Sequence, residues 1–414
     1  MFKVLSATAK SESLPLPAEK IAKFPDLELF ILSAGSRGNP GADVAAKLAA
    51  EAIHTEWLSQ GAQLAVQHRK EPSFELAQKI KKTMRAVFSK ASEALHAHPL
   101  GMSASCECLV LAGSKAFLGH VGNTRTYLKR KGAPHLLTRD HTVVSEVLAA
   151  PEQTLSDFKQ SPFRKHLTRA LGFQAEVEAD FLEIDLLPGD TFWLVSDGFF
   201  EAFHPFEKTD LLNVEEVEPL ERFVQDAIQA HHASEASVLK IEVPQPSKTG
   251  EEVGLAQKKI ETLRKLPLFK YCSYQELIML LGVSHEVEAK RGDRILKEGD
   301  TSPYLFIVIT GSSQVRKEGK TIATKSAGEV LGELGLVEQR ASSADVVVSE
   351  PSVLLALQQK DLFKLFRKHP NLAVKILWAL SQGISQRLRE TTDALVGMEQ
   401  NLPQMNDQPF KGEA

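Results

Sequence analysis

Two cysteines and several histidines are the side chains of this sequence that could act as nucleophiles, bases or zinc ligands. Cys106 and Cys108 are two residues apart on a predicted strand, so their side chains lie on one face. Cys106 and His120 would form a nucleophile–base pair if both lined one pocket. His231 and His232 could contribute to a zinc site, but no third ligand follows at a suitable spacing. We interpret the cysteines as buried packing residues.

One carboxylate follows directly after an apolar strand, in the sequence Ser196-Asp197-Gly198. An aspartate in a turn caps the local backbone. Taken by itself, Asp197 is therefore a candidate capping residue.

The elements that position these residues are strands alternating with long helices. Residues 27–32, 106–111 and 115–120 are predicted strands, and residues 43–59 and 73–97 are predicted amphipathic helices with apolar residues three and four apart. Strand pairs combined with long helices predict an α+β fold of two sheets covered by helices.

The stretch from Gly101 to Arg125, GMSASCECLVLAGSKAFLGHVGNTR, resembles the central hairpin of the metal-dependent (PPM, or 2C-type) protein phosphatases. Three later stretches also match turns and strands of that family: TRDH at 138–141, LTRALG at 167–172 and LLPGDTFW at 186–193. The resemblance covers a predicted domain of residues 1–243. It implies an αββα sandwich and the hydrolysis of phosphoserine and phosphothreonine by two bridged divalent metals.

The family draws the carboxylates of its metal pair from four segments, and this sequence departs from the pattern in three of them. Ser13, Ala34 and Ser234 stand at three ligand positions, while Asp197 is retained at the fourth. The aspartate of the central hairpin is also replaced, by Asn123. The resemblance therefore implies a degenerate phosphatase-like domain that no longer turns over substrate.

Two glutamates lie one residue away from lost ligands, Glu12 beside Ser13 and Glu235 beside Ser234. A displacement of one residue along a strand points the side chain to the opposite face. We therefore do not expect them to restore the site. If they did, Mg or Mn would be the cofactor, and the alternative function would hold: an active serine/threonine phosphatase regulated by cyclic nucleotide.

A second domain is predicted at residues 259–397, after a polar linker at 244–258 that is rich in Pro, Gly and charge. A helix is expected over residues 260–281. Short apolar strands punctuated by glycines follow, which predicts a β-roll or jelly-roll-like fold flanked by helices. A polar tail is predicted at 398–414.

The second domain resembles the cyclic nucleotide-binding domain family through LPLF at 266–269, KRGDRILKEGD at 290–300 and YLFIVITG at 304–311. The family's phosphate-binding cassette aligns with LGELGLVEQRASSADV at 331–346. In the family, helix N-terminal amides and an Arg hold the cyclic phosphate, and a Glu holds the ribose. The resemblance implies these binding positions: Gly332, Glu333, Leu334, Arg340, Ser342 and Ser343.

The phosphate arginine of the family falls on Ser342 here, and the nearest arginine is Arg340, two residues earlier. Either Arg340 reaches the phosphate after a local shift of the loop, or the pocket binds another ligand or none. Asp345, on the same predicted wall, would repel an anion. We expect no cofactor, with cyclic AMP or cyclic GMP as the alternative ligand.

Apolar residues recur three and four positions apart near the C-terminus. The seam consists of Ala373, Leu377, Leu380, Ile384, Leu388, Leu395, Met398 and Leu402. This spacing predicts a coiled coil and hence a homodimer through the C-terminal helix. A helix packed back on its own domain is the alternative.

The composition restricts the possible partners and compartment. A net charge of −4 and a pI near 6.4 over 414 residues give no electrostatic reason to expect nucleic acid or a membrane surface. Three cysteines fit a reducing compartment, and no apolar signal segment begins the sequence, so a cytoplasmic location is expected. We interpret the protein as a signalling or regulatory protein that binds a protein partner, such as a phosphoprotein, without turnover.

Overall fold

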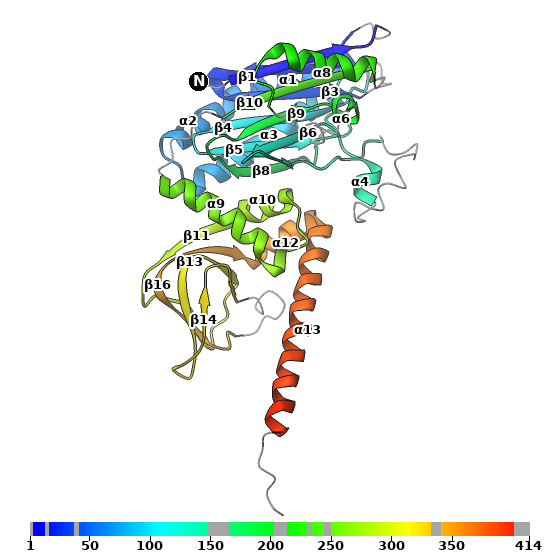
Figure 1. Ribbon diagram of the computed structural model, residues 1–414. Helices are drawn as coiled ribbons and strands as arrows, with labels where there is room; N and C mark the ends of the chain where they lie inside the picture. The colour runs from blue at the N-terminus through cyan, green and yellow to red at the C-terminus, as the bar shows by residue number, and fades with distance from the viewer. Residues whose placement is uncertain are drawn as a thin grey trace, which may run out of the picture.

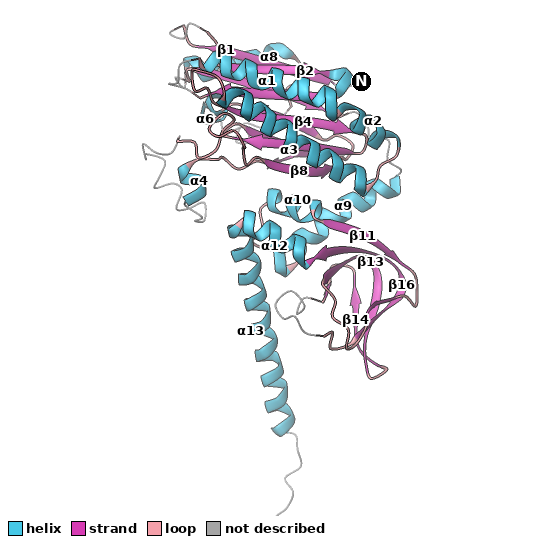
Figure 2. Cartoon of the chain, turned by 180° about the vertical axis from the view of Figure 1, so that it is seen from behind, coloured by secondary structure: helices cyan, strands magenta, loops and turns pink. Residues whose placement is uncertain are grey.

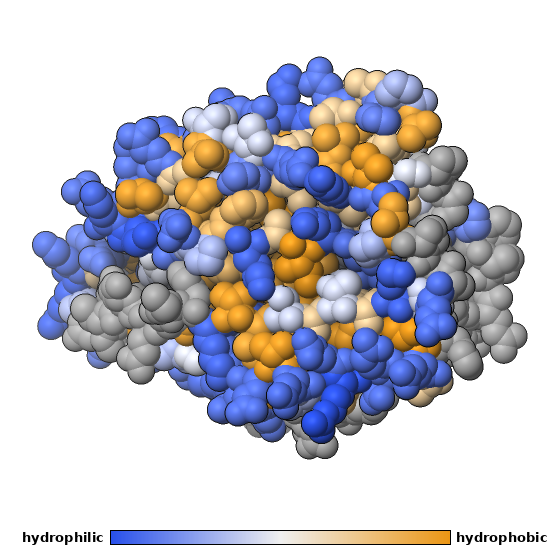
Figure 3. All heavy atoms as spheres, turned by 90° about the horizontal axis from the view of Figure 1, so that it is seen from above, coloured by the Kyte–Doolittle hydropathy of each residue, from blue (hydrophilic) through white to orange (hydrophobic). Residues whose placement is uncertain are grey.

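The structure, a computed structural model, describes residues 3–12, 16–36, 41–147, 166–202, 213–230, 233–243, 250–332 and 341–400. A layered sandwich is followed by a β-roll with flanking helices, and a long helix, α13 (Pro370–Gln400), extends away from the sandwich (Figure 1). At the opposite end of the molecule, hydrophobic side chains gather in the middle of the sandwich surface and hydrophilic ones surround them (Figure 3). Within the described residues, no helix combines the length and apolar character needed to cross a bilayer.

The sandwich consists of two five-stranded antiparallel sheets, with the orders β1-β10-β9-β6-β7 and β2-β3-β4-β5-β8. The strands are β1 (Lys3–Lys10), β2 (Glu19–Phe24), β3 (Leu29–Gly35), β4 (Ala104–Ala112), β5 (Lys115–Val121), β6 (Arg125–Arg130), β7 (Ala133–Leu136), β8 (Asp180–Asp185), β9 (Thr191–Val195) and β10 (Glu235–Glu242). The three strands predicted from the sequence correspond to β3, β4 and β5.

Helices cover the outer face of each sheet, which confirms the predicted αββα layers (Figure 2). One sheet carries α1 (Ala42–Gln60), α2 (Ala62–Lys70) and α3 (Phe74–His96); the other carries α6 (Asp197–Ala202) and α8 (Val217–Gln229). A short helix, α4 (Val143–Val147), follows the TRDH turn. The helix predicted at 73–97 begins where the hydroxyl of Ser73 accepts a hydrogen bond from the Leu76 amide, as an N-cap does.

Alternation along β3 shows how the layers are filled. Phe30 and Leu32 point into the core between the sheets, whereas Leu29 and Ile31 pack against the helices. Successive strand residues face opposite sides, so a strand that is buried on both faces reads as a continuous apolar run. That is why Leu-Phe-Ile-Leu is apolar at every position.

The second unit begins with helices, and here two expectations from the sequence are corrected. The single helix predicted over 260–281 is three elements: α9 (Gly250–Lys265), η3 (Pro267–Phe269) and α10 (Tyr274–Gly282). Pro267 has no amide to continue α9, and Ser273 with Glu276 forms a capping box that starts α10. Residues 250–258 of the predicted linker are helical as the first turns of α9.

The β-roll predicted after these helices is confirmed, with a sheet order of β11-β16-β13-β14. Its strands are β11 (Ser284–Ala289), β12 (Arg294–Leu296), β13 (Tyr304–Lys317), β14 (Lys320–Ser326), β15 (Val330–Leu331) and β16 (Asp345–Gln358). The long strands β13 and β16 bend where the register shifts near Gly311. Gly311 has a φ of +85°, and a Cβ there would lie 2.5 Å from the Pro351 carbonyl oxygen, so only glycine fits. α12 (Gln359–Lys368) and α13 close the domain.

The apolar seam predicted on α13 is only partly exposed. Leu380 is buried against its own domain, together with Leu372 and Ile376, so it cannot also face a partner. The predicted seam is therefore wrong at Leu380, because this side chain faces the core of its own domain. The exposed apolar side chains of α13 are Val374, Leu377, Trp378, Ile384 and Leu388. Leu395, Met398 and Leu402 lie outside the residues whose side chains the structure describes.

The two units share one continuous apolar core. Leu263 of α9, Leu268 of η3 and Leu277 of α10 are buried in the same cluster as Ile184 of β8 and other side chains between the sheets. Sheet edge β8 therefore does not face solvent, because α10 packs against it. The contact is a property of the tertiary structure that the sequence did not predict.

Candidate functional site

The segments predicted to carry metal ligands meet at one end of the sandwich, which we call the metal end. In one sheet, the Ser11 amide donates to the Ser234 carbonyl at 2.8 Å, and Asp197 begins α6 directly after β9. In the other sheet, Ala34 pairs across the strand with Ser105, whose side chain contacts Asn123. The described segments therefore lie close together, and Ser13 lies outside the described residues.

The Asn123 turn is closed by hydrogen bonds to Ser105. The Asn123 amide donates to Ser105 Oγ at 3.1 Å, and that hydroxyl donates to Asn123 Oδ1 at 2.9 Å. The preceding residue, Gly122, has a φ of +102°, and a Cβ there would lie 2.0 Å from Ser105 Oγ. The side chain that replaces the family's aspartate is therefore engaged in holding a tight glycine turn.

Glu235 has a structural partner on each carboxylate oxygen. Its side chain is completely buried, with Oε2 accepting from the Ala18 amide at 2.9 Å and Oε1 from the Glu19 amide at 3.1 Å. These bonds tie β10 of one sheet to the start of β2 in the other. A carboxylate that accepts backbone amides in this way is stabilised as a fixed structural anion. The other predicted substitute, Glu12, is exposed in the turn after β1.

Asp197 is nearly buried at the start of α6. Among the described residues, no group of three or more His, Cys, Asp or Glu side chains is arranged to hold a metal ion. Ala34, which the resemblance aligns with the family's bridging ligand, has no side-chain oxygen. The described residues of the metal end therefore do not fit a two-metal centre, which requires several carboxylates.

A charged pair, Glu107 and His120, lies in the middle of the sandwich. His120 Nδ1 donates to Glu107 Oε1 at 2.6 Å, and Nε2 donates to the Arg139 carbonyl at 2.9 Å. Burial by itself lowers the pKa of His120, but Glu107 outweighs it and raises that pKa, in agreement with a ring that donates from both nitrogens. Thr124 and Thr126 donate to the same carboxylate, which completes its hydrogen bonds.

The structure does not bring Cys106 and His120 together as a nucleophile–base pair. The Cys106 thiol is fully buried, and Sγ lies 3.7 Å from the Glu107 carbonyl oxygen. Burial, followed by the neighbouring Cys108 and the charge of Glu107, raises the pKa of Cys106 well above its usual value. Both cysteines pack in the apolar core, as predicted. His231 and His232 lie outside the described residues.

His141 joins the metal end to β8. Its Nδ1 accepts from the Gly122 amide at 3.1 Å, and its Nε2 donates to Asp180 Oδ2 at 3.2 Å. Burial, helped by the nearby charge of His120, lowers the pKa of His141 to about 4. The ring is therefore neutral at pH 7, which is the protonation state that allows one nitrogen to accept and the other to donate.

Acid should destabilise the protein through His141. The folded-state pKa of about 4 lies below the ordinary 6.5, so the unfolded chain binds a proton first and stability falls as the pH decreases from 7. The loss of unfolding free energy attributable to this group is about 2 kcal/mol between pH 7 and pH 5. Urea unfolding at both pH values should show a smaller loss for His141→Asn than for the parent. His98→Asn, on the surface, is the control, and equal losses in all three proteins would contradict the assignment.

Two buried ion pairs of the sandwich also donate hydrogen bonds to the second unit. Arg130 at the end of β6 holds Asp190 with two parallel hydrogen bonds of 2.9 and 2.7 Å and donates to Tyr274 Oη at 3.0 Å. Lys81 of α3 pairs with Glu183 at 2.7 Å and donates to the carbonyl of Gly282 at the end of α10. Desolvated pairs of this kind are costly to break on one side only.

The predicted ligand positions of the second unit are described only in part. Gly332 follows β15 with a φ of +76°, and Ser342 exchanges backbone hydrogen bonds with the Gly299–Asp300 turn at 2.9 Å each. Ser343 is exposed. Three further predicted positions, Glu333, Leu334 and Arg340, lie outside the described residues.

The expectation that Asp345 lines the ligand pocket is wrong. Ala344 and Val346 on either side are buried, with Val346 in the roll core, so strand alternation points Asp345 away from the roll interior. Its carboxylate accepts from the Glu298 amide at 2.8 Å and lies 4.0 Å from the Arg294 guanidinium. Asp345 is therefore a turn-stabilising residue on the outer face.

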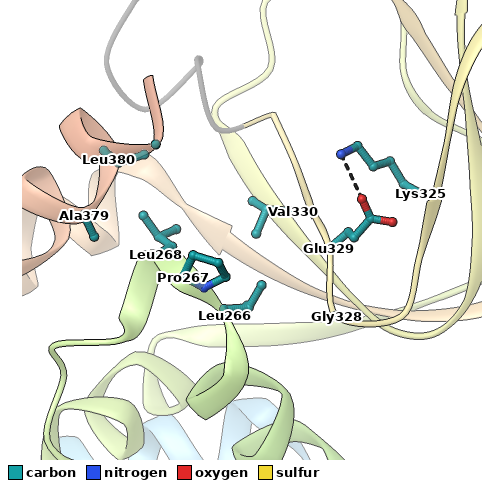
Figure 4. A pocket seen from close by; sticks show the side chains of 10 residues that line it. Leu266, Pro267, Leu268, Lys325, Gly328, Glu329, Val330, Ala379 and Leu380 are labelled. Atoms are coloured by element: carbon teal, nitrogen blue, oxygen red, sulfur yellow. Dashed lines mark hydrogen bonds and ion pairs between the residues drawn. The ribbon is translucent and has the colours of Figure 1, made fainter. Parts of the chain in front are cut away.

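A pocket of about 230 Å³ lies beside the cassette, between η3, β15 and α13. Leu266 and Leu268 of η3, Val330 of β15 and Leu380 of α13 form its apolar part (Figure 4). Lys325 and Glu329, paired at 3.0 Å, line its other side. Because α13 contributes part of the wall, an occupant of the pocket would contact this helix directly.

Sequence reasoning missed the buried contacts that join the two units. His141 was noted only as part of the TRDH match, and its partner Asp180 carries no motif. Lys368 pairs with Asp180, which lies 188 residues earlier in the chain, and donates to the Ala179 carbonyl, 189 residues earlier. Asp180 is the first residue of β8. Nothing in the local sequence around Asp180 identifies partners that are so far away along the chain.

Comparisons with known proteins agree with both resemblances. The family described as Protein phosphatase 2C matches residues 23–240, and the family described as Cyclic nucleotide-binding domain matches residues 286–369. The chain is 27% identical over 184 residues to the serine/threonine phosphatase stp of Listeria welshimeri, which covers 44% of this chain and 71% of that one. It is 30% identical over 132 residues to protein phosphatase PhpP of Streptococcus pneumoniae, with coverage of 31% and 54%.

Among solved structures, the Mycobacterium tuberculosis serine/threonine phosphatase PstP/Ppp is 23% identical to this chain. The match covers 59% of this chain and 99% of that one, with a TM-score of 0.48.

Proposed function

Because the chain belongs to the protein phosphatase 2C family through residues 23–240, more than half of its length, and also carries a cyclic nucleotide-binding domain, we propose that it is a regulatory protein whose phosphatase-like domain binds without turnover. The observation that carries the proposal is that the Glu235 carboxylate is bound to two backbone amides; Ala34, which the resemblance aligns with the bridging ligand, has no side-chain oxygen. Asp197 alone does not supply the charge that two divalent cations require.

We further propose that the metal end docks a protein partner in a cytoplasmic setting. The relatives named above are a serine/threonine phosphatase and a protein phosphatase by name, which supports a phosphorylated or formerly phosphorylated protein as the partner class. The alternative, an active phosphatase under cyclic nucleotide control, needs metal ligands that the described residues do not supply.

Calorimetry of the full-length protein against Mn²⁺, cyclic AMP and cyclic GMP, each alone, tests the proposal. We expect no saturable binding of Mn²⁺ at the metal end, and weak or no binding of either nucleotide. Tight Mn²⁺ binding that disappears in Asp197→Ala would contradict the proposal and support the alternative. Saturable nucleotide binding without Mn²⁺ binding would still support a phosphatase-like domain that only binds. It would also identify the nucleotide as the regulator of that domain.

Ser342→Arg should strengthen cyclic nucleotide binding. The Ser342 backbone is held on the Gly299–Asp300 turn, so a guanidinium placed there would start from a fixed position. A hydrogen bond to a charged group is worth about 1.5–3 kcal/mol, which corresponds to roughly 10- to 150-fold in affinity. Calorimetry with cyclic AMP and cyclic GMP measures the change.

Ser343→Arg, at the exposed neighbouring position, is the matched control and should change the affinity little. Sub-micromolar binding by the parent protein that Arg340→Ala abolishes would show that Arg340 is the phosphate ligand and that the prediction is wrong.

We also propose that α13 forms a homodimer through its exposed apolar side chains. Ile384 and Leu388 are 44% and 67% exposed, and burying each against a second copy is worth roughly 1.5–3 kcal/mol. Changing both to Glu should convert dimers to monomers in light scattering. The control changes Gln386 and Arg389, on a polar part of the same helix, to Glu. A monomeric parent would refute the proposal.

A further inference from the structure

One side chain of the cyclic nucleotide-binding domain reaches into the phosphatase-like domain at the start of β8. Lys368, the last residue of α12, donates from Nζ to the Ala179 carbonyl at 2.8 Å and pairs with Asp180 Oδ1 at 3.1 Å. Asp180 is 6% exposed. The next residue, His369, caps α12, and α13 begins directly after it at Pro370. The contact therefore lies at the base of α13.

Asp180 holds the residue that closes the Asn123 turn. Its other oxygen, Oδ2, accepts from His141 Nε2, and His141 Nδ1 accepts from the Gly122 amide. The Gly122 carbonyl in turn accepts from the His141 amide at 2.7 Å. Three consecutive links, Lys368–Asp180, Asp180–His141 and His141–Gly122, thus connect the base of α13 to the metal end, and all of these residues except Lys368 are buried.

The charges around Asp180 make its position depend on Lys368. Burial by itself raises the pKa of Asp180, but His141, Lys368 and Arg169 outweigh it and hold the pKa well below its usual value. The Arg169 guanidinium lies 3.6 Å from Oδ1, farther than Lys368. Withdrawal of Lys368 would leave a buried carboxylate with less compensation, which favours a different arrangement of Asp180 and His141.

Two other buried contacts between the domains hold α10 and are not parts of this connection. Arg130 binds Tyr274 at the start of α10, and Lys81 binds the end of the same helix. Both hold α10 to the sandwich, whereas Lys368 belongs to the element that leads into α13. Farther along α13, Ala379 and Leu380 line the pocket beside the cassette. A displacement of α13 would therefore act on Lys368, and also on the Lys375–Glu276 ion pair that joins α13 to α10.

We propose that the base of α13 is coupled to the Asn123 turn through Lys368, Asp180 and His141, so that occupancy of the pocket in the cyclic nucleotide-binding domain changes the metal end. The identification of the metal end as a docking surface rests on the proposed function, but the coupling does not. Coupling between two sites is reciprocal, so a change at either end should be measurable at the other. The physical element with two arrangements is the Lys368–Asp180 contact, made or broken.

Hydrogen exchange of the full-length protein tests the coupling. Lys368→Met should speed amide exchange about tenfold in peptides that cover residues 120–124 and 139–142, because about 1.4 kcal/mol of protection is lost. Peptides of β1 and β10 should not change, which separates this effect from global unfolding. Lys368→Arg, which keeps the charge, should restore the parent rates.

Lys364→Met is the matched control, since Lys364 lies one turn earlier on α12, is exposed and pairs at 3.2 Å with Asp361 of the same helix. Any change in amide exchange caused by Lys364→Met should stay within α12. In the reciprocal direction, His141→Asn should speed exchange at residues 368–373. If Lys368→Met prevents folding, Asp180→Asn takes its place with the same expected result.

Faster exchange of α12 and α13 alone, with residues 120–124 and 139–142 unchanged, would overturn the proposal. This readout needs neither a partner protein nor phosphatase activity. A protein that shows the coupling but binds no phosphoprotein would refute the docking function only, so the two failures are distinguishable.

Discussion

The full-length protein is expected to release phosphate from a phosphothreonine peptide no faster in manganese than in a chelator, and Asp197→Ala is expected to leave that rate unchanged. Two-metal hydrolysis needs a metal-bound water as nucleophile and cations that neutralise the phosphoryl group. At the metal end, Ala34 provides no ligand, Asn123 is bound to Ser105, and Glu235 is bound to two amides. Enzymes accelerate their reactions by at least about a million-fold, so the expected difference from an active relative is very large.

The stp phosphatase of Listeria welshimeri, assayed in parallel, supplies the positive control for the peptide and the metal. Ala34→Asp alone should not create activity, because Ser234 still leaves another ligand position without a carboxylate. A manganese-dependent rate in the parent that disappears in Asp197→Ala would show that the site is functional and that other residues complete it.

Replacing Arg130 by Ala is expected to lower the free energy of unfolding by about 3–5 kcal/mol, as for other buried ion pairs that lose one partner. The guanidinium is 7% exposed and Asp190 is 1% exposed. Arg130 also donates to the Asp185 carbonyl at 2.6 Å and to Tyr274 of the second domain. The substitution leaves Asp190 as a buried carboxylate without its cation, at the point where the two domains meet.

Urea unfolding monitored by circular dichroism measures the effect. Lys131→Ala is the matched control, because the neighbouring Lys131 pairs with Glu261 across the same two domains but both side chains are about half exposed. An exposed pair is worth about 1 kcal/mol or less. Equal, small losses in both variants would show that the Arg130 contacts do not contribute to holding the domains together.

The layers of the fold could be predicted from the sequence because local periodicity determines which side of an element is buried. The helices at 43–59 and 73–97 and the strands of the central hairpin are present where their apolar spacing placed them. The inference that Ala34 and Ser234 replace carboxylates likewise comes from the sequence alone, through its resemblance to the family. The prediction of a single helix over 260–281 was wrong because Pro267, which has no amide hydrogen, interrupts a continuous apolar pattern.

Only the tertiary structure decided what the retained polar residues do. Glu235 binds amides 216 and 217 residues earlier in the chain, and Lys368 binds a carbonyl 189 residues earlier. Asp345 faces outward and Leu380 faces inward because of how β16 and α13 pack on their neighbours. Residue type and spacing determine local structure and the chemistry that is available. The partner of a buried charge depends on which distant elements pack together. In this protein, the contacts between such elements hold the two domains together at β8.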